Sequence, residues 1–475
     1  MSYDHGVAAP AVVILAAGQG TRMRSALPKM LHPVCGQPLV QWPIAAAREA
    51  GADRIILVDS PERRLQALAG EGIEIAVQEQ PLGTADAVKA GVAGIEPSRE
   101  QTVVVLNGDV PLITARTIHT LVAEHERTGA AATIATMTLD DPSGYGRIIR
   151  APDGSVERVA ETKAAGDANE SELHIREINT GMFAFDAAAL AAALKQVKPD
   201  NAQGELYLPD VLPIMRAHER SVLAFEVTDH REILQINDRR QLADVTAVAQ
   251  RMIHERHMLA GVTILNPAAT AIDVGVAIGR DTVIAPFTSL HGATAIGAGS
   301  TVGPGATLID AAVGDGSTIL HAYITGATVG DRVNVGPFAY LRPGTVLREG
   351  SKAGTFVEIK NSDVGAGSKV PHLSYIGDAD IGAGTNLGAS TITANYDGYR
   401  KHRTTIGDGV KTSVDTTFIA PVSIGDGAYT AAGSVIDEDV PPGALGIARA
   451  RQRNIEGYDE RRRERESSQN AEPKR

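Results

Sequence analysis

Aliphatic residues recur at every sixth position over much of the second half of the chain. The longest uninterrupted series is Ile278, Ile284, Leu290, Ile296, Val302 and Leu308. The same stride resumes at Val313 and Ile319, at Val329, Val335, Leu341 and Leu347, and at Val364, Val370 and Ile376. An α-helix repeats every ~3.6 residues and a strand every two, so neither produces this period. A parallel β-helix does, because each six-residue unit supplies one short strand and one turn.

Glycine often follows the aliphatic position, where it suits the corner of a coil. The chain contains 49 glycines and only 4% aromatic residues, which fits tight repetitive turns. We therefore predict a β-helix over residues 263–448. Residues 348–363 and 391–405 break the stride, and such interruptions predict surface loops, often on the binding face.

The first half of the chain has a different pattern. Apolar runs at residues 12–15, 55–58 and 103–106 alternate with helix-like segments such as 39–50 and 84–93. Continuous apolar runs are typical of strands buried on both faces, and strand–helix alternation predicts an α/β fold with a mostly parallel sheet over residues 1–237. Residues 238–262 are expected to form a linker helix that begins after Asp238 and ends near Gly261. Residues 449–475 form a charged tail, which we expect to be flexible beyond residue 460.

Composition excludes several classes of protein. The net charge of -12 argues against non-specific nucleic-acid binding, and one cysteine, Cys35, excludes an intrachain disulfide. The apolar run at residues 11–17 is short and follows no Lys or Arg, so we expect no signal peptide. No stretch reaches the roughly 20 apolar residues that span a bilayer. We expect a cytoplasmic protein with no membrane partner.

A glycine-rich loop follows the first predicted strand. Gly18 and Gly20 let the backbone approach a ligand, and Arg22 and Lys29 bring positive charge to the same loop. The spacing is neither that of a P-loop nor that of a dinucleotide fingerprint. By itself, such a loop is more often an ordinary turn than a phosphate site.

The string from Leu15 to Met23, Leu-Ala-Ala-Gly-Gln-Gly-Thr-Arg-Met, and the Leu-Pro-Lys that ends at Lys29 resemble the sugar-1-phosphate nucleotidyltransferases. With the six-residue repeats, residues 10–450 resemble the bifunctional N-acetylglucosamine-1-phosphate uridylyltransferases and glucosamine-1-phosphate N-acetyltransferases. The resemblance implies a Rossmann-like α/β nucleotidyltransferase domain, a helical linker and an all-β left-handed parallel β-helix of hexapeptide repeats. It also implies a homotrimer, Mg²⁺, acetyl-CoA as acyl donor, and the synthesis of UDP-N-acetylglucosamine, a precursor of peptidoglycan and lipopolysaccharide.

The resemblance assigns roles in the first half. Asp109 and Asn237 match the Mg²⁺ ligands, and Arg22 and Lys29 are the expected catalytic cations. Gln78, Gly83 and Thr84 match the uracil-recognising segment, and Gly146, Glu161 and Asn179 match sugar-binding positions. The full nucleotide and sugar set is Leu15, Ala16, Ala17, Gly18, Lys29, Gln78, Gly83, Thr84, Asn107, Gly108, Asp109, Gly146, Glu161, Asn179 and Asn237. The family usually has an aromatic residue where this chain has Asn107.

The implied chemistry is in-line displacement at phosphorus. The phosphate oxygen of the sugar-1-phosphate attacks the α-phosphorus of UTP, and pyrophosphate leaves. A phosphate nucleophile is already ionised at neutral pH, so no general base is required. Catalysis then consists mainly of positioning and charge neutralisation.

A second set of residues matches the acetyltransferase site. Arg342 and Lys360 match binders of the sugar phosphate, His372 matches the general base, and Glu358 is the candidate carboxylate that orients its ring. An imidazole can take the amine proton at neutral pH. Substrate contacts are expected at Tyr375, Asn386, Asn395 and Tyr396, and acetyl-CoA contacts at Ala389, Asn395, Tyr396, Val414, Ala432 and Arg449. The family usually has Gly-Ser-Asp where this chain has Ser413-Val414-Asp415.

Two other functions remain open on the sequence. One is a single-activity adenylyl- or thymidylyltransferase whose β-helix serves only assembly or regulation, which Arg342, Lys360 and His372 together disfavour. The other is a non-catalytic assembly protein. The expected partners are small molecules, namely UTP, N-acetylglucosamine-1-phosphate, glucosamine-1-phosphate and acetyl-CoA, with no nucleic acid.

Overall fold

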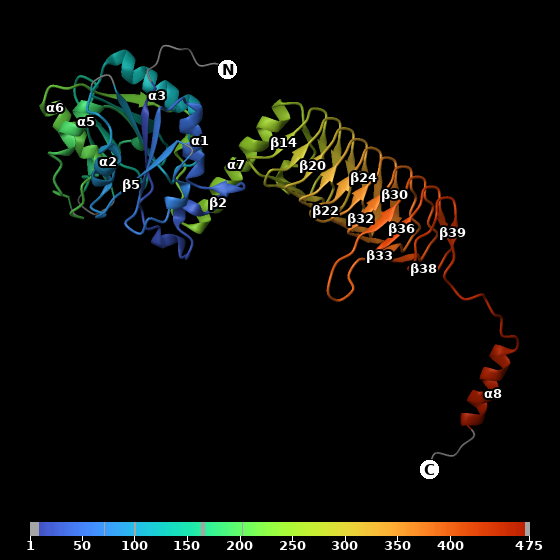
Figure 1. Cartoon of the computed structure of the whole chain (residues 1–475). Helices are drawn as coiled ribbons and strands as arrows, with labels where there is room; N and C mark the ends of the chain where they lie inside the picture. The colour runs from blue at the N-terminus through green and yellow to red at the C-terminus, as the bar shows by residue number, and fades with distance from the viewer. Residues whose placement is uncertain (1–8, 71, 99–100, 163–166, 202, 471–475) are drawn as a thin grey trace. The chain divides into compact units, whose positions relative to one another are not determined.

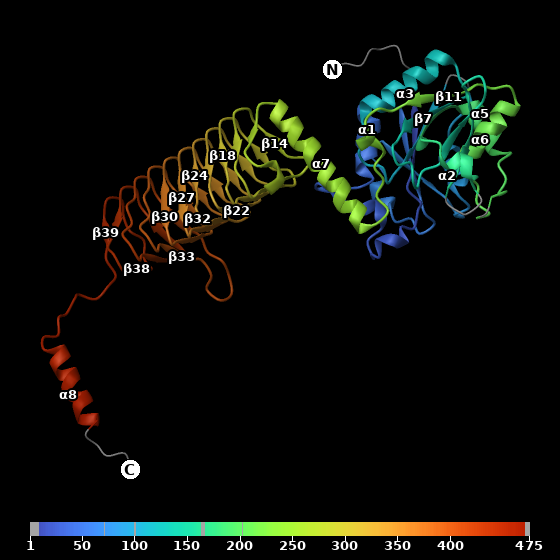
Figure 2. The same ribbon diagram turned by 180° about the vertical axis from the view of Figure 1, so that it is seen from behind.

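The computed structural model describes residues 9–470 except 71, 99–100, 163–166 and 202. The chain divides into two compact units, Met1–Glu255 and Arg256–Arg475. The first contains a mixed sheet with helices, and the second contains a stack of short strands (Figures 1 and 2). Within the described residues, no helix combines the length and apolar character needed to cross a bilayer.

The first unit is built on one large sheet. Its main strands, in spatial order, are β11 (Val222–Glu226), β7 (Ala132–Thr138), β10 (Glu177–Asp186), β6 (Thr102–Asn107), β1 (Ala11–Leu15), β4 (Arg54–Asp59) and β5 (Ile73–Val77). β8 (Arg147–Arg150) and β9 (Val156–Ala160) form an antiparallel pair beside β10, and β2 (Pro33–Val34) pairs with β3 (Gln37–Pro38). The apolar runs of β1, β4 and β6 pair in parallel, and β10 runs antiparallel to β6 and β7.

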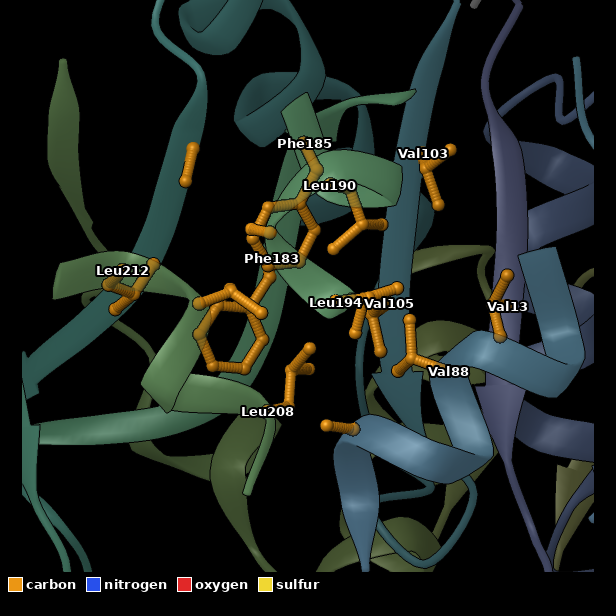
Figure 3. Packing of buried hydrophobic residues seen from close by; sticks show 14 of the residues in the cluster. Val13, Val88, Val103, Val105, Phe183, Phe185, Leu190, Leu194, Leu208 and Leu212 are labelled. Atoms are coloured by element: carbon orange, nitrogen blue, oxygen red, sulfur yellow. The ribbon is translucent and has the colours of Figure 1, made fainter. Parts of the chain in front are cut away.

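Helices cover both faces of this sheet. The helices of the unit, apart from α7 described below, are α1 (Gln41–Glu49), α2 (Thr84–Val92), α3 (Ala115–Thr128), α4 (Glu170–Leu173), α5 (Ala187–Leu194) and α6 (Val211–Ala217). Alternate residues of β1 and β6, such as Val13 and Val105, pack with Val88 of α2 and Leu190 of α5 in one buried cluster (Figure 3). Gly91 of α2 has no side chain to hold the helix away from Val13.

The strand order reverses at β1. The chain continues from β1 to β4 on one side and later returns to β6 on the other. In an open α/β sheet, a crevice forms at such a switch point, outside the carboxyl ends of the strands. The glycine-rich loop after β1 and residues 108–110 after β6 therefore meet at the same edge of the sheet.

A long helix, α7 (Arg239–Leu259), contains the boundary between the two units. Asp238 caps its start, because its Oδ1 accepts a hydrogen bond from the Gln241 N–H at 2.8 Å. Gly261 follows the helix with a positive φ of 96°.

The second unit is a parallel β-helix with three sheets. The first sheet holds β12 (Thr263–Ile264), β15 (Val283–Ile284), β18 (Thr301–Val302), β21 (Thr318–Ile319), β24 (Asn334–Val335), β27 (Lys352–Thr355) and β30 (Lys369–His372). The second holds β13 (Thr270–Ile272), β16 (Thr288–His291), β19 (Thr307–Ile309), β22 (Ala322–Thr325), β25 (Ala339–Leu341), β28 (Glu358–Lys360), β31 (Tyr375–Gly377), β33 (Ile392–Ala394), β35 (Thr417–Ile419) and β38 (Val435–Ile436). The third holds β14 (Ala277–Ile278), β17 (Ala295–Ile296), β20 (Ala312–Val313), β23 (Thr328–Val329), β26 (Val346–Leu347), β29 (Asp363–Val364), β32 (Ala379–Ile381), β34 (Thr404–Ile406) and β36 (Val422–Ile424). A further pair, β37 (Tyr429–Thr430) and β39 (Leu445–Gly446), closes the far end.

The six-residue anchors stack on one another through the coils. Ile284 pairs with Val302, Val302 with Ile319, and Ile319 with Val335, and all four side chains are buried. Each coil thus adds three short strands to a common apolar core, as the period predicts.

One predicted interruption is wrong. Residues 348–363 do not leave the coil, because β27, β28 and β29 pair in register with the strands before them. The small residue Ala353 takes the buried position opposite Val335, so the pattern of large aliphatic residues is interrupted although the coil is not. Residues 391–405 contain β33 and the start of β34, and only 395–403 project between them as a loop (Figure 1).

Part of the predicted charged tail is helical. Residues Tyr458–Asn470 form α8, and the side chains of residues 458–469 are exposed. Its charges lie in the i,i+4 register that supports a solvated helix, with Arg463 paired to Asp459 at 2.8 Å and Arg462 to Glu466 at 3.3 Å. Residues 471–475 of the predicted tail lie outside the described residues.

Gly354 in β27 provides a test of the stacking. A Cβ at this position would overlap the carbonyl oxygen of Pro371 on the next coil, directly before His372. We expect Gly354→Ala to destabilise the β-helix by about 1–3 kcal/mol, because the coils would have to separate. Thermal unfolding followed by circular dichroism measures this. Gly275→Ala is the control, since its Cβ would meet only Gly292 O at 3.4 Å; equal effects of the two substitutions would contradict the close stacking.

Candidate active sites

A cavity of about 700 Å³ lies at the carboxyl ends of β1 and β6. Most residues of the predicted nucleotide and sugar set line it, together with the predicted catalytic Arg22; those of the set are Leu15, Ala17, Gly18, Lys29, Gln78, Gly83, Thr84, Asn107, Asp109, Gly146, Glu161, Asn179 and Asn237. The two others, Ala16 and Gly108, do not line it and hold the loops in place. The Ala16 N–H donates to Val58 O at 3.0 Å, and the Gly108 N–H donates to Leu15 O at 2.9 Å.

Four charged or polar side chains converge in this cavity from distant parts of the sequence. Lys29 Nζ donates to Asp109 Oδ2 at 2.6 Å and to Asn237 Oδ1 at 3.1 Å. Arg22 donates to the same Asn237 oxygen at 3.0 Å. The Lys29 and Asp109 side chains are only 7% and 13% exposed, so little water screens the pair.

Local backbone geometry brings these side chains together. Lys29 begins a short 3₁₀ turn after Pro28, and Gly20 lies against it with a φ of 62°. A Cβ on Gly20 would lie 2.5 Å from Lys29 Cβ, so this loop accommodates the lysine only because residue 20 has no side chain. The Ile236 N–H donates to Asp109 O at 3.0 Å, which fixes the segment carrying Asn237 beside the end of β6.

Asp109 and Asn237 form a donor set that fits Mg²⁺. The carboxylate and the amide each direct an oxygen to one cationic group, Lys29 Nζ. Mg²⁺ takes one or two protein oxygens and completes its shell with substrate phosphates and water. Within the described residues, no three or more His, Cys, Asp or Glu side chains come together as a metal site. A cation at Asp109 and Asn237 would therefore need substrate phosphates and water as its further ligands.

The predicted uracil-recognising residues lie next to one another at the start of α2. Gln78 Nε2 donates to Gly83 O and to Asp86 Oδ2, both at 3.0 Å, and Thr84 Oγ1 accepts from the Leu208 N–H at 2.9 Å. The described chain gives Gln78 Oε1 no hydrogen-bond donor, so this oxygen is available to a ligand N–H. Gly83 has a φ of 125°, and a Cβ there would overlap Leu206 O.

The predicted sugar-binding residues also lie close together. The Asn179 N–H donates to Gly146 O at 2.9 Å, and Asn179 Oδ1 accepts from the Gly181 N–H at 2.8 Å. A Cβ on Gly146 would lie 2.8 Å from a Val159 methyl group and 3.6 Å from the Glu161 carboxyl carbon, so the glycine keeps space open beside that carboxylate. Asn107, which departs from the family pattern, lies against Gly181, where a Cβ would overlap its amide.

The sequence analysis missed several cavity residues. They include Gln19, Thr21, Tyr145, Gln203, Glu205 and Gln235. Gln235 donates to Asp109 Oδ2 and accepts from Asn237, and its position two residues before Asn237 in an extended segment was the available signal. Beside the cavity, burial raises the pKa of Asp210 to about 6, and the negative charges of Glu161 and Asp200 add to the effect.

The β-helix brings a second set of charged residues together. Arg342 donates to Glu358 Oε1 at 2.8 Å, and Lys360 lies 3.3 Å from Asp378. Asp378 also accepts from the Asn361 and Asn395 side chains. The neighbouring Lys401 amine and the Asp378 carboxylate raise the pKa of Lys360, while the Lys360 charge lowers the pKa of Lys401.

His372 is exposed at the end of β30. The expected contact with Glu358 is not present, because the only described hydrogen bond of that carboxylate is with Arg342. His372 pairs with Thr355 across β30 and β27, whereas Glu358 lies on β28 in another sheet, so the two residues belong to successive coils. Tyr375 pairs with Glu358 across β31 and β28, and its hydroxyl lies with Asn395 over Gly377.

Three of the predicted acetyl-CoA contacts, Ala389, Val414 and Ala432, form a column with His372. The carbonyl oxygens of His372, Ala389 and Val414 accept hydrogen bonds from the N–H groups of Ser390, Asp415 and Gly433 on successive coils. His372, Ala389, Val414 and Ala432 therefore occupy equivalent positions on four successive coils. Val414, at a turn, is 47% exposed. Asn386 forms single β-bridges with Lys369 and Lys411 on the adjacent coils. Tyr396 is exposed within the loop 395–403, and Arg449 is exposed after β39.

Comparison with known proteins identifies the family. The MobA-like NTP transferase domain matches residues 12–173. The bifunctional protein GlmU of Mycolicibacterium vanbaalenii is 49% identical over 461 residues, which cover 95% of this chain and 93% of that protein. The bifunctional proteins GlmU of Mycobacterium tuberculosis and Mycobacterium marinum are 48% and 46% identical, each over 95% of this chain and 92% and 93% of their own lengths.

The chain belongs to the bifunctional GlmU family. It is an enzyme with uridylyltransferase and acetyltransferase activities, as the resemblance of its motifs predicts. A single-activity transferase with a merely structural β-helix is not favoured, since the similarity to bifunctional GlmU proteins extends through both units.

Asp210 makes the stability of the nucleotidyltransferase half depend on pH. Its pKa is about 6 in the fold and 3.8 ordinarily, so the folded chain holds this proton more tightly than the unfolded chain. The stability that the proton contributes is complete below about pH 4 and lost as the pH rises through 6. We expect Asp210→Asn to raise the unfolding temperature at pH 8 by at least about 2 °C and much less at pH 4, measured by calorimetry.

The exposed Asp53 supplies the control for that measurement. Asp53→Asn should leave the unfolding temperature nearly unchanged at both pH values. An Asp210→Asn variant with the same effect at pH 4 and pH 8 would contradict a raised pKa for this carboxyl.

Proposed function

We propose that the cavity at β1 and β6 joins the uridylyl group of UTP to N-acetylglucosamine-1-phosphate with Mg²⁺ at Asp109 and Asn237. The observation that carries the proposal is the convergence of Lys29, Asp109 and Asn237 within hydrogen-bonding distance in a cavity of about 700 Å³. This volume lies in the range of small-molecule and cofactor sites. The nucleotidyltransferase domain comprises residues 1–237, followed by the linker 238–262.

The reaction needs positioning and positive charge. The phosphate oxygen of the sugar phosphate attacks the α-phosphorus, the bond from that phosphorus to the bridging oxygen breaks, and pyrophosphate leaves with the electron pair. Bound Mg²⁺ supplies charge neutralisation at the phosphates. Asp109 and Asn237 would hold the cation, and Lys29 and Arg22, which face the same point in this structure, would then be free to bind the phosphate oxygens.

The two ends of the cavity divide recognition between base and sugar. The free oxygen of Gln78 accepts from the uracil N–H, and Gly83 and Thr84 hold the start of α2 beside it. Glu161 and Asn179 bind sugar hydroxyl or amide groups, in the space that Gly146 leaves open. An amide and a carboxylate at fixed positions discriminate substrates by hydrogen bonds, which reject analogues more strongly than apolar contacts do.

We expect Asp109→Asn to lower UTP-dependent release of pyrophosphate at least about 100-fold, because it removes the only carboxylate of the metal site. A coupled pyrophosphate assay measures this rate, and acetyl transfer by the same variant should remain at the unchanged level. Asp140→Asn, at a fully exposed side chain, is the matched control. An unaltered rate in Asp109→Asn would overturn the metal assignment.

For the β-helix unit, residues 263–448, we propose acetyl transfer from acetyl-CoA to the amine of glucosamine-1-phosphate. Arg342 and Lys360 hold the phosphate, and the amine nitrogen attacks the thioester carbonyl. His372 accepts the amine proton, the carbon–sulfur bond breaks with its electron pair going to sulfur, and the leaving thiolate takes up a proton to become the thiol. The pantetheine arm runs along the column of Ala389, Val414 and Ala432, where small or short side chains leave room, and Arg449 meets a phosphate.

Glu358 contributes through Arg342 in this proposal. The ion pair at 2.8 Å aims the guanidinium, while Tyr375 and Asn395 form the adjoining wall with Asn386 and Tyr396 nearby. His372 receives its orienting partner from elsewhere in the assembled enzyme.

We propose that the assembly is a homotrimer with the acetyl-transfer site at a contact between copies. One corner of the β-helix carries apolar side chains that are strongly exposed: Phe287, Phe338, Phe356 and Leu373 are 74%, 57%, 57% and 57% exposed. Phe338 and Phe356 stack at 5.4 Å, and Leu373 follows His372 directly. Exposed apolar ladders of this kind mark protein contacts. We place the enzyme in the cytoplasm.

His372→Ala should abolish acetyl transfer, with a loss of at least about 100-fold, because the amine proton then has no acceptor. Release of pyrophosphate from UTP and N-acetylglucosamine-1-phosphate should be unaltered, which the two assays on one preparation reveal. His291→Ala, on a coil remote in sequence, is the control. Retention of acetyl transfer in His372→Ala would exclude this histidine as the base.

The complete function is tested by supplying glucosamine-1-phosphate, acetyl-CoA, UTP and Mg²⁺ and detecting UDP-N-acetylglucosamine by mass spectrometry. Omission of acetyl-CoA should leave glucosamine-1-phosphate unconverted, and omission of UTP should stop the sequence at N-acetylglucosamine-1-phosphate.

A further inference from the structure

The side chain of Gln235 joins the two proposed metal ligands. Its Nε2 donates to Asp109 Oδ2 at 2.9 Å, and its Oε1 accepts from Asn237 Nδ2 at 3.0 Å. We propose that Gln235 is a positioning residue of the uridylyltransferase site, which fixes the oxygens that Asp109 and Asn237 present to the divalent cation. The inference rests on the proposed function of this cavity.

The bond to Asn237 decides which end of its amide faces the cation. An asparagine amide carries one oxygen and one nitrogen, and only the oxygen can ligate Mg²⁺. Because Gln235 Oε1 takes up the Nδ2 end, Asn237 Oδ1 faces the opposite way. There it accepts from Lys29 and Arg22, at 3.1 and 3.0 Å, and so already faces positive charge.

The bond to Asp109 holds the carboxylate while its cationic partner changes. Asp109 Oδ2 accepts from both Lys29 and Gln235. When Lys29 leaves for a substrate phosphate, Gln235 remains and prevents the carboxylate from turning away. Partners of this kind behind metal ligands typically alter metal affinity 10–100-fold when removed.

Glutamine is suited to this position because it donates and accepts at once. One side faces a carboxylate, which needs a donor, and the other faces an amide N–H, which needs an acceptor. Methionine has a similar length and shape but provides neither.

A purely structural role for the amide is less consistent with the backbone. The Ile236 N–H already joins this segment to Asp109 O at 3.0 Å, and the Asn237 N–H donates to Gln241 Oε1 at 2.7 Å. The segment therefore stays in place without the Gln235 side chain, and what the side chain adds is the orientation of the two ligands.

The test is the affinity for Mn²⁺, used as a paramagnetic substitute for Mg²⁺. Electron paramagnetic resonance measures Mn²⁺ binding to the full-length enzyme with UTP present. We expect Gln235→Met to raise the dissociation constant about tenfold. The Mg²⁺ concentration for half-maximal pyrophosphate release should rise in parallel, whereas kcat at saturating Mg²⁺ should change by less than that factor. Acetyl transfer should be unaltered.

Gln196→Met removes the same amide from an exposed position after α5 and serves as the control. If Gln235→Met does not fold, Gln235→Asn takes its place, since the shorter amide cannot reach both ligands. A Mn²⁺ dissociation constant within twofold of that of the unsubstituted enzyme would overturn the role of Gln235.

The same experiment separates this inference from the function on which it rests. If the unsubstituted enzyme binds Mn²⁺ with UTP, Asp109→Asn abolishes binding and Gln235→Met does not weaken it, only the assignment of Gln235 fails. If the unsubstituted enzyme shows no divalent-cation binding with UTP, the metal site itself fails and the inference with it.

Discussion

The ammonium group of Lys29 holds together three segments that are far apart in the sequence. It bonds Asp109, which follows β6, and Asn237, which precedes α7, and it starts from the loop after β1. A nearly buried carboxylate without a partner costs folding free energy, so the cavity needs a cation beside Asp109. The same requirement fits the proposed Mg²⁺ site, because exchange of one cation for another would never leave Asp109 unpaired.

This arrangement depends on the order of the strands. β1 and β6 are neighbours and parallel, so their carboxyl ends place the glycine-rich loop and Asp109 side by side. The Ile236–Asp109 backbone hydrogen bond then brings the end of the unit to the same edge. The β-helix brings the residues of its proposed site together in a different way. There, every coil repeats the same backbone, so residues at equivalent positions stack into a column and the chemistry depends on which side chain occupies each coil.

Sequence alone predicted the parts of each unit that follow from period and motif. The six-residue stride gave the β-helix because aliphatic side chains must face a narrow core at every turn. The prediction failed at Ala353, because a small residue occupies the buried position there and does not continue the pattern of large aliphatic residues. The hydrogen-bond partners of individual side chains could not be predicted from the sequence either. Glu358 is near His372 in the sequence, yet the two residues lie on strands of different sheets, and Glu358 pairs with Arg342 instead. Gln235 carries no motif, and only the meeting of two distant segments reveals what its amide contacts.

The two sites differ in how many of their side chains find an orienting partner within a single chain. In the nucleotide cavity, every ligand of the proposed metal already has a partner that orients it, and the charges are balanced within the unit. In the proposed acetyl-transfer site, Arg342 and Lys360, which we propose to hold the sugar phosphate, are paired with carboxylates. His372 is exposed, and no hydrogen bond orients its ring in the described chain. A base that must take a proton at a defined angle needs such a contact. Next to His372 begins the apolar corner of Leu373 and Phe356, which is costly to leave in water. A second copy that covers this corner would both bury the apolar side chains and supply the missing partner of the histidine, so assembly and catalysis would depend on the same contact.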